Sequence, residues 1–167
     1  MDSRRVVRAG PQGLIRIALD TNVLVYAEGV GRDADDDRKV GDALRLIEAM
    51  RRHSVFSSLA IQTVAEAHQV LIRKQHLNTR EAQSRIQFWR AFSDLVPTDE
   101  AVFDAALELA SNHHFQIYDA IILAAAVQAR CDLLLSEDMQ DGFAWRGVTI
   151  ANPFAATLEP RLARLLA

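Results

Sequence analysis

Short apolar runs alternate with longer amphipathic stretches along this chain. The apolar runs are typical of buried strands. They fall at 14–19, 55–58, 133–135 and 148–151, with a short edge element at 95–96. The amphipathic stretches predict helices at 40–50, 61–74, 79–92, 99–112, 119–130 and 155–166. Because strands and helices alternate, the pattern predicts an α/β fold with a central parallel sheet and helices on both faces.

Three segments depart from this simple alternation. The stretch at 119–130 is apolar on nearly all sides, which predicts a helix buried at the centre of the fold. The stretch at 29–37 is rich in Gly and Asp and predicts a mobile loop. Residues 1–13 contain three arginines and no apolar run, so we expect a flexible extension rather than a secretory signal. Residues 14–167 then form a single domain.

Composition narrows the possible functions only a little. A chain of 167 residues that is 50% hydrophobic can bury a substantial core. Its net charge of −3 does not indicate a nucleic-acid binder as a whole, so a polyanion would need local Arg clusters or metal ions. Cys131 is the only cysteine, which excludes an intrachain disulfide and favours a reducing compartment. The longest apolar run is too short for a membrane span, and we expect a soluble cytoplasmic protein.

Three aspartates stand where the predicted strands and the buried helix meet. Asp20 follows the first apolar run, Asp138 follows the run at 133–135, and Asp119 stands at the start of the all-apolar helix. Ligands of open parallel sheets bind beyond the carboxyl ends of the strands, where the helices also begin. We therefore expect the three side chains to meet at one edge of the sheet.

A fourth acid, Glu66, lies on a polar stripe of the helix at 61–74. The stripe comprises Gln62, Glu66, Gln69 and Arg73. Such a stripe faces either solvent or a cleft. If it faces a cleft, Glu66 projects toward the three aspartates and Arg73 is available for a phosphate.

Carboxylates that crowd together oppose one another's ionisation, and a divalent cation removes that cost. A ligand set of oxygens without paired His or Cys favours Mg²⁺ or Mn²⁺ over Zn²⁺. Such an ion supports hydrolysis of a phosphodiester. Thr21, Asn22 and Ser136 add neutral groups suited to orienting a metal-bound water or a phosphate. Asp141 is either an outer ligand through water or a solvated loop acid.

Four segments in order resemble the motifs of PIN-domain proteins, and in particular of VapC-like toxins. They are Asp20-Thr21-Asn22 after the first strand, the helix 62–74 around Glu66, Tyr118-Asp119-Ala120, and the segment 135–142 followed by Asn152-Pro153-Phe154. The resemblance covers roughly residues 15–155. It implies a three-layer sandwich and an endoribonuclease that depends on Mg²⁺ or Mn²⁺. It also implies a homodimer that a small antitoxin, encoded alongside, inhibits.

Each acid taken alone has a simpler interpretation. Asp119 suits a helix N-cap, Asp20 and Asp138 suit turns or loops, and Glu66 suits a solvated helix face. Two other functions also stay open. One is a haloacid-dehalogenase-like phosphatase, although such an enzyme needs a second acid where this chain has Asn22. The other is a catalytically silent PIN module that only binds.

Overall fold

The computed structural model describes residues 15–31 and 33–167, so the predicted extension at 1–13 lies outside the described residues. The elements follow one another in the order β1 (Ile17–Leu19), α1 (Thr21–Ala27), α2 (Ala34–Arg52), β2 (Ser57–Ala60), α3 (Ile61–Gln75), α4 (Thr79–Phe92), β3 (Ser93–Val96), α5 (Glu100–His113), α6 (Ile117–Gln128), β4 (Leu133–Leu135), β5 (Ala144–Trp145), β6 (Val148–Ala151) and α7 (Pro160–Leu166). No helix in this described part is both long and apolar enough to cross a bilayer.

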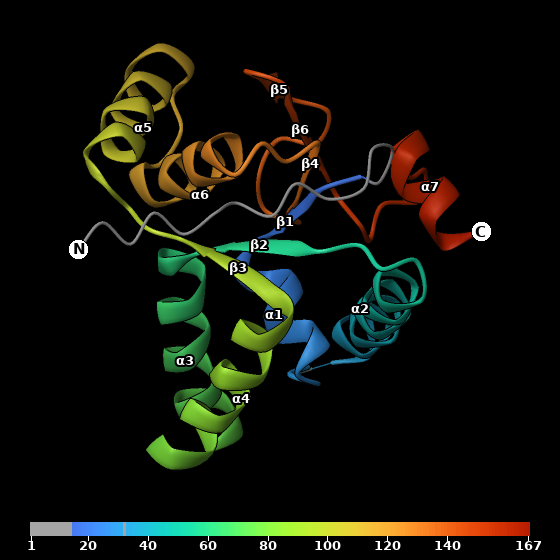
Figure 1. The fold of residues 1–167 in the computed structure, drawn as a ribbon. Helices are drawn as coiled ribbons and strands as arrows, with labels where there is room; N and C mark the ends of the chain where they lie inside the picture. Colours follow the sequence, from blue (N-terminus) through green and yellow to red (C-terminus); the bar gives the residue numbers. More distant parts are fainter. Residues whose placement is uncertain (1–14, 32) are drawn as a thin grey trace.

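The six strands form one mostly parallel sheet in the order β3-β2-β1-β4-β6-β5. Only the β5–β6 pair is antiparallel. β1 lies between β2 and β4, and Leu19 is in register with Leu135. Helices cover both faces of the sheet (Figure 1), so the predicted α/β fold is confirmed.

Alternating side chains of the strands divide the core into two clusters. Leu19 packs with α1, α2, α3, α4 and α7, whereas its neighbour Ala18 packs with α5 and α6 on the opposite face. Seven consecutive residues of α6, 120–126, are buried. The prediction of a central helix that is apolar on nearly all sides is therefore confirmed.

Helix α2 begins inside the segment that the sequence predicted to be a loop. The side chain of Asp33 caps the helix by accepting hydrogen bonds from the backbone N–H groups of Asp35 and Asp36. Negative side chains in the first turn also suit the positive end of the helix dipole. The prediction of a loop at 29–37 is thus wrong from Ala34 onward.

The structure differs from the sequence-based elements at three further places. Helix α1 and the short strand β5 were not predicted. β2 lies two residues later than expected because Ser57 and Ser58, although polar, are buried in the sheet. The last helix begins at Pro160 instead of residue 155, with Glu159 as its cap and proline in the first turn.

Candidate active site

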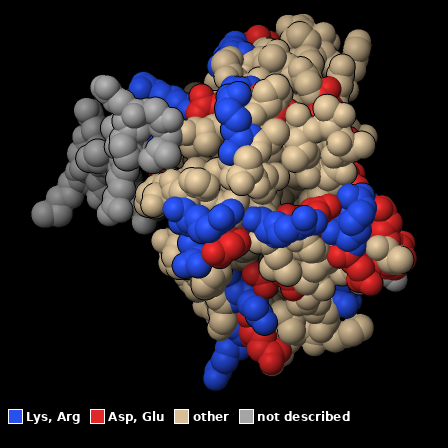
Figure 2. Space-filling model, turned by 90° about the vertical axis from the view of Figure 1, so that its right-hand side faces the viewer, with Lys and Arg blue, Asp and Glu red and all other residues tan. Residues whose placement is uncertain are grey.

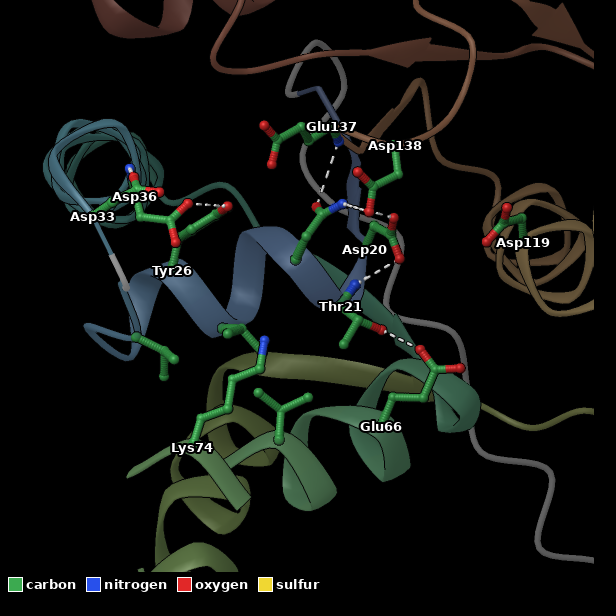
Figure 3. A pocket seen from close by; sticks show the side chains of 14 residues that line it. Asp20, Thr21, Tyr26, Asp33, Asp36, Glu66, Lys74, Asp119, Glu137 and Asp138 are labelled. Carbon is green, nitrogen blue, oxygen red and sulfur yellow. Dashed lines mark hydrogen bonds between the residues drawn. The ribbon is translucent and has the colours of Figure 1, made fainter. Parts of the chain in front are cut away.

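A pocket of about 520 Å³ opens at the carboxyl ends of β1 and β4, and all four predicted acids line it. Asp20 follows β1, Asp138 follows β4, Glu66 comes from α3 and Asp119 from the first turn of α6 (Figure 3). We call these four residues the inner end of the pocket. The pocket continues along α1 to Tyr26, Asp33, Asp36 and Glu137, which we call the outer end.

Asp20 is held rigidly by three neighbours. Its Oδ1 accepts a hydrogen bond from the backbone N–H of Thr21 at 2.6 Å, and its Oδ2 accepts one from the Ser136 hydroxyl at 2.6 Å. Ser136 is fully buried and accepts a hydrogen bond from the backbone N–H of Met139. The pairing of β1 with β4 brings Ser136 beside Asp20, whose own N–H donates to the carbonyl of Leu135.

Burial raises the pKa of Asp20 from 3.8 to about 6. Only 6% of the residue is exposed. The hydrogen bonds from Ser136 and Thr21 oppose this rise, whereas the charges of Asp119 and Asp138 add to it. The site therefore holds a carboxylate whose charge is costly unless a cation is near.

Asn22 lies between two of the aspartates. Its Nδ2 donates to Asp138 Oδ2 at 3.1 Å and to Asp20 Oδ2 at 3.4 Å. Its Oδ1 accepts from the backbone N–H of Glu137 at 3.4 Å. The amide thus links the loop after β4 to the start of α1, and it separates two carboxylates that would otherwise repel each other.

Glu66 faces the pocket, and both of its carboxylate oxygens accept hydrogen bonds from neutral groups. Oε2 accepts from the Thr21 hydroxyl at 2.7 Å, and Oε1 accepts from Gln62 Nε2 at 2.6 Å. Of the two interpretations of the polar stripe on this helix, the structure therefore supports the cleft for Glu66, whereas Gln62 donates to Glu66 without lining the pocket. Thr21 contacts both Asp20 and Glu66, so it connects two of the acids.

Asp119 differs from the other three acids because it makes no hydrogen bond or ion pair with any described residue. It stands apart on α6, across the pocket from Asp20 (Figure 3). Burial raises its pKa, and the charges of Glu66 and Asp138 raise it further. The interpretation of Asp119 as an N-cap is wrong, since Gln116 occupies the cap position and Asp119 lies inside the first turn.

The carboxylates of the inner end suit a hard divalent cation, but they are not arranged around one common ion position. All four acids offer carboxylate oxygens, which Mg²⁺ and Mn²⁺ prefer. Within 15–31 and 33–167, no three His, Cys, Asp or Glu side chains are placed so that they hold one ion together. The Asn22 amide lies between Asp20 and Asp138. Simultaneous binding of one ion by three acids therefore requires side-chain movement.

Two other predicted site residues lie elsewhere. Arg73 is exposed and does not line the pocket, whereas its neighbour Lys74 does. Asp141 also lies outside the lining, and its Oδ1 accepts a hydrogen bond from the backbone N–H of Asn152 at 2.8 Å. This contact ties the loop after β4 to the end of β6, so Asp141 has a structural role in the described arrangement.

Sequence reasoning missed the outer end of the pocket. Glu137 was not among the predicted site residues, but it lines the pocket and its Oε1 lies 2.6 Å from Lys39 Nζ. Lys39 also pairs with Asp35 at 2.8 Å, and the Tyr26 hydroxyl donates to Asp36 at 2.9 Å. These hydrogen bonds raise the pKa of Lys39, whereas the pKa of Tyr26 is raised chiefly by burial and then by its bond to Asp36. The spacing of Asp35 and Lys39, four residues apart on one helix, was the only local sequence feature that could have indicated these ion pairs.

The model of the PIN domain family matches residues 17–143, a range that contains all four acids. Three solved structures share the fold. A chain from a toxin–antitoxin complex of Klebsiella pneumoniae is 21% identical, with 82% of this chain and 97% of that chain covered and a TM-score of 0.57. VapC20 of Mycobacterium tuberculosis, a toxin that cleaves the sarcin-ricin loop, is 17% identical over 71% of this chain and 86% of its own, with a TM-score of 0.54.

VapBC2 of Rickettsia felis, solved with a DNA fragment from its promoter, is 14% identical over 73% of this chain and 86% of the matched chain. Its TM-score is 0.54. At these identities the likeness establishes the fold. None of the curated proteins compared with this chain matches it.

Proposed function

This chain belongs to the PIN domain family, and from that premise we propose that it is a metal-dependent endoribonuclease that hydrolyses phosphodiester bonds of RNA. One observation carries the proposal. Four carboxylates from four separate segments line one pocket; neutral donors bind three of them, and no described residue binds the side chain of Asp119. Asp20 also caps α1, but none of the four has a basic partner among the described residues, so this arrangement favours a site that receives a cation.

Asp20, Glu66, Asp119 and Asp138 would hold Mg²⁺ or Mn²⁺ at the inner end. When bound there, such an ion lowers the pKa of a water molecule and neutralises charge on the phosphate. Ser136 and the N–H of Thr21 keep the Asp20 carboxylate in one orientation. Thr21 and Gln62 do the same for Glu66, and Asn22 for Asp138.

Asp119 has a distinct part in this proposal. Because no described residue donates a hydrogen bond to it, its carboxylate is free to turn toward a ligand or to accept a proton from the attacking water. Burial and then the charges of Glu66 and Asp138 raise its pKa, so this carboxylate accepts a proton more readily than an ordinary aspartate does. The three hydrogen-bonded acids then supply a fixed frame, and Asp119 supplies the adjustable group.

The decisive experiment is cleavage of RNA by the purified chain with Mg²⁺ or Mn²⁺. Cleavage is expected with either ion, none after chelation, and none with Asp119→Asn in the presence of metal. Hydrolysis of p-nitrophenyl phosphate without RNA cleavage would support the phosphatase alternative instead. RNA cleavage that survives both chelation and Asp119→Asn would contradict the proposal.

We also propose that the chain is the toxin of a toxin–antitoxin pair, bound by a small antitoxin and active as a cytoplasmic homodimer. The support is its likeness to the toxin–antitoxin structures above. Two exposed apolar surfaces are available for protein contacts. One is a groove of about 270 Å³ between α2 and α4 with Phe56, Phe88 and Phe92, and the other contains Phe103 and Leu107 of α5.

Expression of the chain alone is expected to arrest growth. Asp20→Ala and Asp119→Ala should each relieve the arrest, and light scattering of the purified chain should give the mass of a dimer. Full arrest by both variants would favour the silent binding module. Co-expression of the neighbouring small gene should restore growth with the wild-type chain.

A further inference from the structure

Of the two lysines of this chain, Lys39 pairs with acids beside the pocket, whereas Lys74 lines the pocket itself. The sequence contains seventeen arginines and just two lysines, Lys39 and Lys74. Lys39 is 14% exposed at its side chain and pairs with Asp36 and Glu137 of the outer end. Lys74 makes no hydrogen bond or ion pair with any residue of the described chain, and its side chain lines the pocket.

Lys74 lies at the end of a row on α3 that begins with Glu66. Glu66, Val70 and Lys74 are spaced four residues apart, and all three line the pocket. At 1.5 Å of rise per residue, the row is about 12 Å long. Val25 of α1 also lines the pocket, so a groove with an apolar floor joins the inner end to Lys74. Figure 3 shows the ammonium group of Lys74 turned toward α1.

The charge of the groove makes this single cation important. Seven carboxylates line the pocket, and Lys74 is the only basic residue among its described lining residues. A metal ion would neutralise the inner end, but the rest of the groove would still repel a nucleic-acid backbone. A strand that follows the groove therefore needs a positive group at the position that Lys74 occupies.

The basic residues on the neighbouring α2–α7 face do not offer an equal alternative. Figure 2 shows Lys and Arg side chains across that face, with Asp and Glu side chains beside them. Arg38, Arg45 and Arg51 of α2 each pair with an acid three or four residues away on the same helix. These pairs offset the charge of the three arginines locally, so each attracts a polyanion less than an unpaired cation does.

We propose that Lys74 binds a phosphate of the RNA backbone further along the strand from the cleaved one, and thereby fixes the strand along the groove between α1 and α3. This inference rests on the proposed nuclease function, and it replaces Arg73 with Lys74 as the basic residue that receives substrate. Lys74 is then a positioning residue, because its contact lies about two helical turns from the reacting phosphate.

The matched pair Lys74→Gln and Arg73→Gln tests the assignment. Both remove one positive charge at adjacent positions of α3, but only Lys74 lines the pocket. Binding of a short single-stranded RNA is measured by fluorescence anisotropy at several salt concentrations, in an Asp119→Asn background that prevents cleavage. Lys74→Gln should weaken binding about tenfold and reduce the slope of log K against log salt by about 0.7, the value for one lost single-strand phosphate contact. Arg73→Gln should change binding less than about twofold.

A second experiment locates the phosphate. Methylphosphonate linkages, which are uncharged, are placed one at a time along the same RNA. At one linkage, the methylphosphonate should weaken RNA binding to the Asp119→Asn protein as much as Lys74→Gln does. The same methylphosphonate should not weaken binding further when the protein also carries Lys74→Gln. Lys74→Arg should retain most of the affinity.

Equal losses in the two Gln variants, or no linkage that couples to Lys74, would overturn the assignment. Because binding is measured without turnover, this outcome is independent of the cleavage assay. Absence of cleavage by the wild-type chain, together with coupling at Lys74, would refute the nuclease function and leave the phosphate contact standing.

Discussion

The two ends of the pocket contain similar numbers of acids, but the acids have different hydrogen-bond and ion-pair partners at each end. At the outer end, Glu137 pairs with Lys39, Asp36 accepts from the Tyr26 hydroxyl, and Asp33 caps a helix. At the inner end, the acids contact hydroxyl, amide and backbone N–H groups, and Asp119 contacts none of these. Asp36 and Glu137 of the outer end thus share one cation, Lys39, within 4.0 Å, whereas none of the inner acids has a cation beside it among the described residues.

This difference separates structural carboxylates from carboxylates that await a ligand. A lysine already held by an acid cannot be displaced cheaply by an incoming cation, because the cation must then compete with a formed ion pair. A neutral donor leaves the negative charge intact while it fixes the orientation of the oxygen. Burial and, to a smaller extent, the neighbouring carboxylates raise the pKa of Asp20 and Asp119.

The largest expected difference between the two ends is catalytic. Asp119→Asn should lower kcat for RNA cleavage more than about 100-fold, because even a lost hydrogen-bond partner of a metal ligand costs about 10- to 100-fold. Glu137→Gln, the matched change at the outer end, should lower kcat only a few-fold. Single-turnover cleavage at saturating Mn²⁺ measures both, with circular dichroism as the control for folding. Equal losses of kcat in Asp119→Asn and Glu137→Gln would contradict a functional difference between the two ends of the pocket.

The second expected difference concerns stability without metal. The pKa of Asp20 rises from 3.8 to about 6 on folding, so between these values the folded chain binds more protons than the unfolded chain. Stability from this group is therefore greatest at low pH and falls as pH rises toward 6. At neutral pH the buried charge costs about 3 kcal/mol in the metal-free protein.

Urea unfolding at pH 5 and pH 7.5 checks this, with chelator present. Wild type should lose more stability over that interval than Asp20→Asn, and Asp20→Asn should be the more stable protein at pH 7.5. Added Mn²⁺ should raise the midpoint of wild type by more than that of Asp20→Asn. Identical pH profiles for the two proteins would mean that Asp20 carries no such cost.

The third prediction concerns Ser136, which supports Asp20 from a fully buried position. Ser136→Ala should reduce Mn²⁺ affinity or cleavage about 10- to 100-fold, and the pKa of Asp20 should rise further because its hydrogen bond lowers that pKa. Ser57→Ala is the control, since Ser57 is also buried and hydrogen-bonded, to Ser93, but lies outside the pocket. If Ser57→Ala reduced Mn²⁺ affinity or cleavage as much as Ser136→Ala does, the effect would come from the loss of a buried hydroxyl in general and not from the support of Asp20.

Local rules found the inner acids because their positions follow from strand ends and helix starts. Asp20 and Asp138 each come soon after a buried apolar run, and Asp119 lies in the first turn of the helix whose residues 120–126 are all buried. Helix α1 was not predicted because it has only seven residues and follows closely on β1. So short an apolar segment does not show the period of a helix. The pairing of Lys39 with Glu137 escaped because no local pattern relates residues so far apart.

The choice between Arg73 and Lys74 shows a subtler limit. On a helical wheel Arg73 lies within about 20° of Glu66, which made it the natural partner on the polar stripe. The pocket instead follows the oblique row of residues four apart, which runs from Glu66 through Val70 to Lys74. Only the placement of α1 beside α3 decides which row faces the substrate, and the sequence of α3 does not contain that information.

The smallest expected effect tests whether the outer end is only structural. Lys39→Met should destabilise the fold by about 1 kcal/mol, because the ion pair with Glu137 is largely shielded from water on both sides. Glu137→Gln should cost a similar amount, and the double variant less than the sum, since the two share one interaction. Urea unfolding of the three variants gives the coupling energy, and kcat measured alongside should stay within a few-fold of wild type. If Lys39→Met instead impaired cleavage as severely as Asp119→Asn while the fold stayed stable, the outer end would belong to the chemistry, and a basic partner would no longer mark a carboxylate as structural in this pocket.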